Sequence, residues 1–223
     1  STALAKHGDR RRTLMDIEAR DEFAGTELKF PQVLFARDCR ELEEAAEQLA
    51  FPVVLKRPGI QHKTEEGAVV LDIRDAGQLL ASAVKMGGDR GYLVEQQVAG
   101  AVAEILIGVT RELESALLLT IGSGGIHTEL FKDVRHLLLP TKADSVLREL
   151  KRLRAWKLLE GFRGRSGGDV GSLVQAALAV GNYAVRNAET LVDIEVNPFL
   201  VLPNSGYAVD LVINTNMKRT SAK

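Results

Sequence analysis

The sequence predicts an α/β protein with two lobes on one continuous chain. Up to about residue 90, short aliphatic runs alternate with amphipathic helical patterns in the order strand, helix, strand, strand, helix. The glycine-containing segment Gly87–Gly91 separates this unit from a second set of strands and helices. No internal repeat or low-complexity linker interrupts the chain. Two α/β lobes that meet near residue 90 are therefore the predicted organisation.

The composition excludes several broad classes of protein. The 223 residues carry a formal net charge of -1, with 45% hydrophobic and 26% charged residues. This near-neutral balance gives no electrostatic argument for a nucleic-acid or membrane partner. The single cysteine, Cys39, cannot form an intrachain disulfide, which favours a reducing compartment. No stretch approaches the roughly 20 apolar residues that span a bilayer, and the first residues lack a signal core, so we expect a cytoplasmic protein.

The elements of the first lobe, residues 14–90, follow from local patterns. Predicted helices have apolar residues three or four apart, and two of them begin after an aspartate, Asp38 or Asp75, that can cap the free backbone N–H groups. Residues 1–13 are predicted to be a flexible tail. The predicted elements are a helix at Leu14–Ala24, a strand at Val33–Phe35, a helix at Arg40–Ala50, strands at Val53–Leu55 and Ala68–Ile73, and a helix at Ala76–Met86.

The second lobe, residues 91–214, is predicted from longer aliphatic runs, and residues 215–223 from their polarity as a flexible tail. The strand Tyr92–Val98 leads from the first lobe into the second. The further predicted elements are strands at Glu104–Val109 and Ala116–Ile121, helices at Ala143–Leu153 and Val170–Val185, and strands at Leu191–Val196, Phe199–Leu202 and Tyr207–Val212.

The stretch after Lys56 offers groups that suit a polyphosphate. Lys56 ends a short aliphatic strand, and the loop that follows carries His62, Lys63 and Gly67. A lysine supplies a mobile point charge, and a glycine lets backbone N–H groups approach an anion closely. A β-hairpin with a solvated basic tip would explain the same residues.

Two further groups could contact an anion or a cation. Gly122–Gly125 has three glycines at the end of a strand, which indicates either an anion-binding loop or a simple turn. Glu195 and Asn197 are two residues apart and so face the same side of a strand, and Asp210 lies on the next strand. Such oxygens suit Mg²⁺, although a polar pair at a sheet edge is the simpler interpretation.

Several familiar motifs are missing. The sequence has no G-x-x-x-x-G-K-[ST] loop, no G-x-G-x-x-G after a strand and no G-x-S-x-G elbow, and its histidines lack zinc-ligand spacing.

Five motifs in order, spread over residues 14–213, resemble one family. VVLK at residues 53–56 followed by GI-HKTE-G at residues 59–67 resembles the signature "VVLK…DI-HKSD-GG" of the ATP-grasp β subunit of NDP-forming acyl-CoA synthetases. The best known members are the ADP-forming acetyl-CoA synthetases, and succinyl-CoA synthetase is a more distant relative. The other four motifs are similar to "ELIVGV", "GLGGIFVELLKDV", "LLRGYRGR" and "ELDINPL", and begin at residues 104, 122, 158 and 193.

The resemblance implies an ATP-grasp fold, in which two α/β lobes clamp ATP or ADP with Mg²⁺. It implies the reaction acyl-CoA + ADP + phosphate ⇌ acid + CoA + ATP, by way of an acyl phosphate and a phosphohistidine. His62, with Lys63 beside it, matches the histidine that takes the phosphoryl group, a role that suits neutral imidazole. The predicted nucleotide-binding residues are Lys56, Gly67, Glu95, Gln96, Val98, Glu104, Gly124 and Gly125. The predicted metal ligands are Glu195, Asn197 and Asp210.

The sequence also departs from the family pattern. The family's "QEMV" is Glu95–Val98 here, so the glutamate and glutamine are exchanged. The second glycine of "GGV" is Ala68, and the arginine of "FRLAPL" is Leu137.

The CoA-binding domain and the domain with the second phosphohistidine are not in this sequence. The resemblance therefore implies a separate α subunit or a fused domain, a hetero-oligomer in the cell, and a small carboxylic acid as substrate. Two other functions remain open: another ATP-grasp carboxylate ligase, or a non-catalytic nucleotide-sensing domain of a fused protein acetyltransferase.

Overall fold

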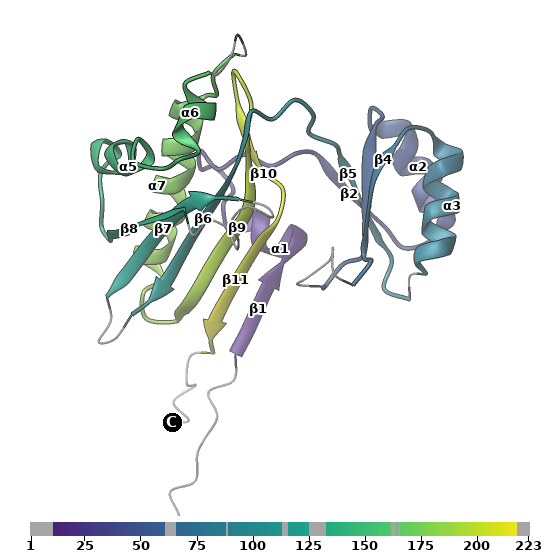
Figure 1. The fold of residues 1–223 in the computed structure, drawn as a ribbon. Coiled ribbons are helices and arrows are strands. Elements are labelled where there is room, and N and C mark those ends of the chain that lie inside the picture. The colour runs from purple at the N-terminus through teal and green to yellow at the C-terminus, as the bar shows by residue number, and fades with distance from the viewer. Residues whose placement is uncertain are drawn as a thin grey trace, which may run out of the picture.

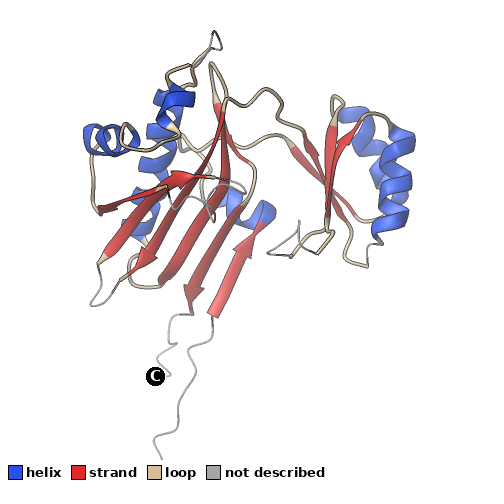
Figure 2. Cartoon of the chain, in the orientation of Figure 1, coloured by secondary structure: helices blue, strands red, loops and turns tan. Residues whose placement is uncertain are grey.

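The structure is a computed structural model, and it describes residues 11–60, 66–87, 89–112, 116–124, 133–161, 164 and 166–217. Two β-sheets lie side by side, each with helices against one face (Figures 1 and 2). We call the four-stranded sheet with its two helices the small lobe, and the seven-stranded sheet with its helices the large lobe. In the part of the chain that the structure describes, no helix is long and apolar enough to cross a membrane.

The small lobe confirms the predicted elements of residues 33–96. Its strands are antiparallel in the order β2-β5-β3-β4, and α2 and α3 pack on one face (Figure 1). The predicted aspartate caps are present, because Asp38 accepts from the N–H of Glu41 at 3.0 Å and Asp75 from that of Gln78 at 2.8 Å. The elements are β2 (Val33–Ala36), α2 (Cys39–Gln48), β3 (Val53–Lys56), β4 (Val69–Ile73), α3 (Ala76–Met86) and β5 (Tyr92–Gln96).

The large lobe is built on a sheet in the order β1-β11-β9-β6-β7-β8, with β10 paired to β9. Its strands are β1 (Arg11–Met15), β6 (Ala103–Arg111), β7 (Leu117–Ser123), β8 (Val134–Leu138), β9 (Leu191–Val201), β10 (Gly206–Ala208) and β11 (Leu211–Asn216). Its helices are α1 (Asp16–Asp21), α5 (Ala143–Leu150), α6 (Trp156–Leu159) and α7 (Val170–Arg186).

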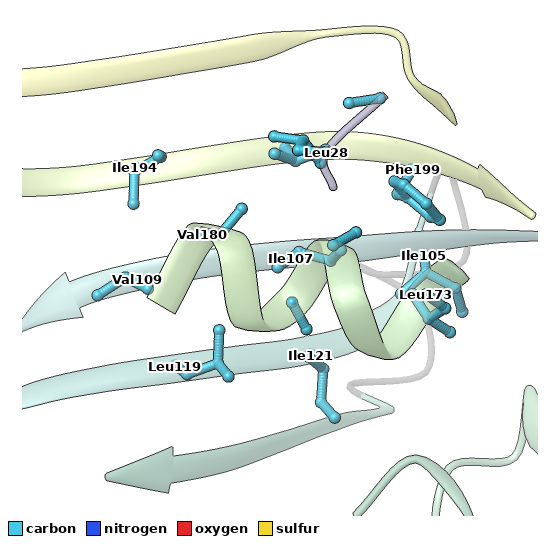
Figure 3. Close-up of a cluster of buried hydrophobic side chains, with 14 of the residues drawn as sticks. Leu28, Ile105, Ile107, Val109, Leu119, Ile121, Leu173, Val180, Ile194 and Phe199 are labelled. Carbon is cyan, nitrogen blue, oxygen red and sulfur yellow. The ribbon is translucent and has the colours of Figure 1, made fainter. Parts of the chain in front are cut away.

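The core of the large lobe lies between α7 and one face of this sheet, as Figure 3 shows. Alternate residues of the strands, such as Ile107 on β6 and Leu119 on β7, point toward Leu173 and Val180 of the helix (Figure 3). The residues between them lie on the opposite face, which we call the polar face. On the polar face, strand pairing aligns four residues in one row across the sheet: Glu195, Gly108, Thr120 and His136.

The first described residues correct two predictions. Residues 11–13, expected in the tail, belong to β1, and the expected helix Leu14–Ala24 is instead the end of β1 followed by the shorter α1. The strand forms because β1 pairs along its length with β11, where Leu14 lies opposite Ile213. Leu14, Ala19 and Phe23 are buried in the large-lobe core, so this segment packs with the last strands of the chain.

The last strands also differ from the prediction. A single strand, β9, replaces the two predicted strands Leu191–Val196 and Phe199–Leu202, because it continues through Pro198. Proline has no backbone N–H, and a strand tolerates it where that N–H is not needed for pairing. The predicted strand Tyr207–Val212 divides into β10 and β11, which both pair with β9. Residues 215 and 216, expected in the C-terminal tail, end β11. The short β8 and α6 were not predicted.

Candidate functional site

Lys56 lies where the two lobes meet. It is the last residue of β3, its backbone is opposite Leu93 of β5, and only 8% of its surface is exposed. Its Nζ donates to Oε1 of Glu95 at 2.7 Å and to the carbonyl oxygen of Val209 at 2.8 Å. Val209 lies between β10 and β11, so Lys56 joins the small lobe to the large lobe.

Glu95 is almost completely buried, with 2% of its surface exposed. Its second carboxylate oxygen forms an ion pair with Arg20 of α1, and Arg20 also donates to the carbonyl oxygen of Pro31 at 3.1 Å. We call Arg20, Lys56 and Glu95 the buried charge cluster. It holds two cations and one anion, and two of its members, Lys56 and Glu95, are predicted nucleotide-binding residues.

The loop between β3 and β4 is held at its base. The N–H of Gly59 donates to Oδ2 of Asp16 at 2.8 Å, and the N–H of Arg57 donates to the carbonyl oxygen of Ala68 at 2.9 Å. Gly67 has a φ of +64°, a left-handed conformation that glycine adopts without strain. The predicted catalytic residues His62 and Lys63 lie outside the described residues.

The connection from β5 to β6 carries the other predicted nucleotide-binding residues. The Gln96 side chain accepts from the N–H of Ala50 at 3.1 Å and donates to the carbonyl oxygen of Pro52 at 3.2 Å, so it holds the segment before β3. Val98 is half-buried in the connection itself. Both carboxylate oxygens of Glu95 are engaged, one by Lys56 and the other by Arg20.

Gly124 is placed by a close approach between backbones. Its N–H donates to the carbonyl oxygen of Glu104 at 2.7 Å. A Cβ at this position would lie 2.9 Å from the carbonyl carbon of Glu104 and 3.0 Å from the nitrogen of Ile105. The structure therefore accounts for this glycine by packing, while the Glu104 side chain is exposed. Gly125 lies outside the described residues.

Asp133 is a buried residue to which the sequence alone assigned no role. Its carboxylate accepts from the Ser123 hydroxyl at 2.7 Å and from the backbone N–H groups of Arg154 and Ala155 at 2.9 and 3.2 Å. Burial alone would raise the pKa of Asp133, but these hydrogen bonds outweigh burial and lower it. The only sequence signal was the KDV motif of residues 132–134.

Two of the predicted metal ligands, Glu195 and Asn197, lie on β9, and the third, Asp210, directly precedes the neighbouring strand β11. The Nδ2 of Asn197 donates to Oε1 of Glu195 at 3.1 Å, and the backbone N–H of Asn197 donates to the carbonyl oxygen of Asp210 at 3.2 Å. Among the described residues there is no group of three or more His, Cys, Asp or Glu side chains that could hold a metal ion. Two carboxylates and one amide nevertheless fit Mg²⁺, which keeps several waters and takes its other ligands from phosphate oxygens.

Two antiparallel sheets flanked by helices, with a buried lysine at their junction, are the architecture of an ATP-grasp protein. The chain belongs to the ATP-grasp domain family, whose sequence model matches residues 5–215. This confirms the predicted fold class and the predicted family.

The chain is similar to subunits and domains of ADP-forming ligases. It is 26% identical to the acetate–CoA ligase [ADP-forming] I subunit beta of Pyrococcus furiosus over 89% of this chain and 90% of that one. It is 29% identical to acetate–CoA ligase [ADP-forming] II of Archaeoglobus fulgidus over 82% of this chain, but it spans only 27% of that longer ligase.

A solved structure shows the same fold. Acetyl-coenzyme A synthetase 1 of Ca. Korarchaeum cryptofilum, in complex with coenzyme A and Ca-AMPCP, superposes with a TM-score of 0.85 at 25% identity, over 92% of this chain and 93% of that one. The same synthetase has been solved with Mg-AMPPCP and with its phosphohistidine segment pointing towards the nucleotide binding site.

Proposed function

We propose that this chain is the nucleotide-binding β subunit or domain of an ADP-forming acid–CoA ligase, acting in the cytoplasm. The observation that carries the proposal is the position of Lys56, a buried cation between the lobes of an ATP-grasp fold, which donates to the carbonyl oxygen of Val209 next to Asp210. The similarity to ligases of this type supports the chemistry.

In this proposal each lobe contributes part of the nucleotide site. Lys56 binds the phosphates of ATP or ADP, and the backbone after Glu95 receives the adenine. Glu104 lies toward the ribose, and Glu195, Asn197 and Asp210 hold Mg²⁺. Bound Mg²⁺ would neutralise charge on the phosphate oxygens.

The phosphoryl group moves between ATP and His62. A ring nitrogen of neutral His62 forms the bond to the γ-phosphorus as the bond from phosphorus to the ADP oxygen breaks, and Lys63 offsets charge on the transferred group. The phosphohistidine segment of the Korarchaeum synthetase supports this role. Because the chain spans 27% of the Archaeoglobus ligase, CoA and the acid would bind on an α subunit or a fused domain.

The test is the formation of a phosphoramidate. With [γ-³²P]ATP, Mg²⁺ and the partner subunit, we expect acid-labile, base-stable label on the wild type. We expect its loss in His62→Asn, with ATP still bound. His136→Asn is the matched control, because His136 is exposed on β8 and contacts Thr120 at 3.0 Å.

Label that survives in His62→Asn would refute the role of His62. ATP binding without label in the wild type would favour the nucleotide-sensing alternative.

A further inference from the structure

The buried charge cluster conflicts with simple phosphate binding by Lys56. An ammonium group has three N–H donors, and Lys56 already gives two of them to Glu95 and Val209. The Glu95 acceptor is a carboxylate at 2.7 Å. A phosphate oxygen that approaches Lys56 therefore meets an anion that is already in contact with the same ammonium.

Glu95 is fixed in this position from several sides. Its backbone pairs with Val33 of β2 on one side and with Val54 of β3 on the other. Arg20 engages the carboxylate oxygen that Lys56 does not. Because only 2% of Glu95 is exposed, water offers it little alternative solvation if Lys56 moves away.

We propose that Glu95 sets the affinity of this site for polyphosphate by competing with the ligand for Lys56. The inference rests on the proposed function, because it takes Lys56 as the phosphate-binding lysine. Two effects act together: Glu95 occupies donors of Lys56, and its charge repels phosphate across a region of low dielectric constant. The ion pair with Arg20 holds the carboxylate of Glu95 beside Lys56.

The test is calorimetric titration of the full chain with Mg-ATP and, as a probe without a base, with tripolyphosphate. Glu95→Gln keeps the size of the side chain and removes its charge. We expect this variant to bind both probes about tenfold more tightly, which corresponds to about 1.4 kcal/mol. Glu44→Gln is the matched control, because it removes the same charge from an exposed position of the small lobe, where Glu44 pairs with Arg40 at 3.2 Å. We expect its affinity to equal that of the wild type.

Tighter binding is a result that structural damage does not produce. Unchanged or weaker binding of both probes by folded Glu95→Gln would overturn the inference. If that variant does not fold, Glu95→Asp carries the test, because it draws the charge back from Lys56 by one methylene. We expect about threefold tighter binding from it, and unchanged binding would overturn the inference equally.

Lys56→Met separates this inference from the proposed function. If it leaves tripolyphosphate binding unchanged, Lys56 is not the phosphate-binding lysine, and both fail. If it weakens binding while Glu95→Gln tightens nothing, only the role of Glu95 fails. Weaker binding in Lys56→Met together with tighter binding in Glu95→Gln supports both.

Discussion

The carboxylate of Asp16 accepts a hydrogen bond from the backbone N–H of Gly59, 43 residues further along the chain, at 2.8 Å. Asp16 is the first residue of α1, directly after β1 of the large lobe, and Gly59 follows β3 of the small lobe. Asp16 has a φ of +56°, a left-handed conformation that aspartate tolerates better than most residues. A residue in an unfavourable conformation thus provides a contact between the lobes.

Asp16→Ala is expected to destabilise the protein by about 2 kcal/mol. The variant loses the hydrogen bond to Gly59 and places alanine in a left-handed conformation, and each effect is worth roughly 1 kcal/mol. Asp16→Asn keeps an acceptor oxygen and tolerates the same φ, so we expect a loss below about 0.5 kcal/mol. Urea unfolding of both variants measures the difference, and equal stabilities would contradict this explanation of Asp16.

Gly124→Ala is expected to cost about 1–3 kcal/mol of stability, because its Cβ would press on the backbone of Glu104 and Ile105 at 2.9–3.1 Å. Gly108→Ala is the matched control on the same sheet. There the nearest heavy atom to the new Cβ, the carbonyl oxygen of Ile194, is 3.4 Å away, so we expect a smaller loss. Thermal unfolding compares the two, and a larger loss from Gly108→Ala would show that contact with Glu104 is not decisive.

The double variant Asn197→Ala, Asp210→Asn is expected to raise the Mg²⁺ concentration needed for ATP binding more than it alters binding without metal. The measurement is ATP affinity as a function of Mg²⁺. Asn214→Ala with Asp193→Asn is the matched control: the same two residue types lie on the paired strands β11 and β9, joined by a hydrogen bond of 2.8 Å. A Mg²⁺ dependence shared by both double variants and the wild type would exclude the proposed metal ligands.

Asp133 is expected to make stability depend on pH in the acid range. Its folded-state pKa lies below the ordinary value of 3.8, so the stability that its carboxylate contributes is present above about pH 4 and is lost as the pH falls through the folded pKa. Asp133→Asn lacks this contribution. The difference in unfolding free energy between wild type and variant should therefore be constant from about pH 5 to 7 and shrink below about pH 4.

Asp169 does not disturb this comparison. Its hydrogen bonds from the side chain and backbone of Ser172 also lower its pKa, but it is present in both proteins and cancels in the difference. A wild-type-to-variant difference that stays constant down to pH 3 would contradict the effect of Asp133.

Local patterns in the sequence were enough to predict most of the fold. The helix Ala76–Met86 has the predicted bounds because an aspartate cap, an apolar stripe and a terminal glycine all lie within it or beside it. The position of Lys56 at the end of its strand was also predicted, since an aliphatic run stops there. The backbones of Asn197 and Asp210 meet because the strands on either side of each residue, which the sequence pattern detected, pair with one another.

Contacts between distant segments were beyond such patterns. Arg20 and Glu95 are 75 residues apart, and neither has a neighbour in sequence that indicates the other. The strand Arg11–Met15 is polar at its start and was not recognised, because the partner that makes it a strand is at the far end of the chain. Asp133 looked like an ordinary charged residue, since its partners come from two other segments.

The pairing of β1 with β11 sets an order for folding during synthesis. Thr13 and its hydrogen-bond partner Asn214 are 201 residues apart, and the whole small lobe lies between them. As the chain leaves the ribosome, residues 33–96 can complete their own sheet early, whereas β1 waits for its partner β11 until residues 211–216 have been made. Closing so long a loop is slow, so the large lobe should be the later unit to fold. Among the described strands of the two sheets, β1 is thus made before the others, and it pairs only after all of them have been made.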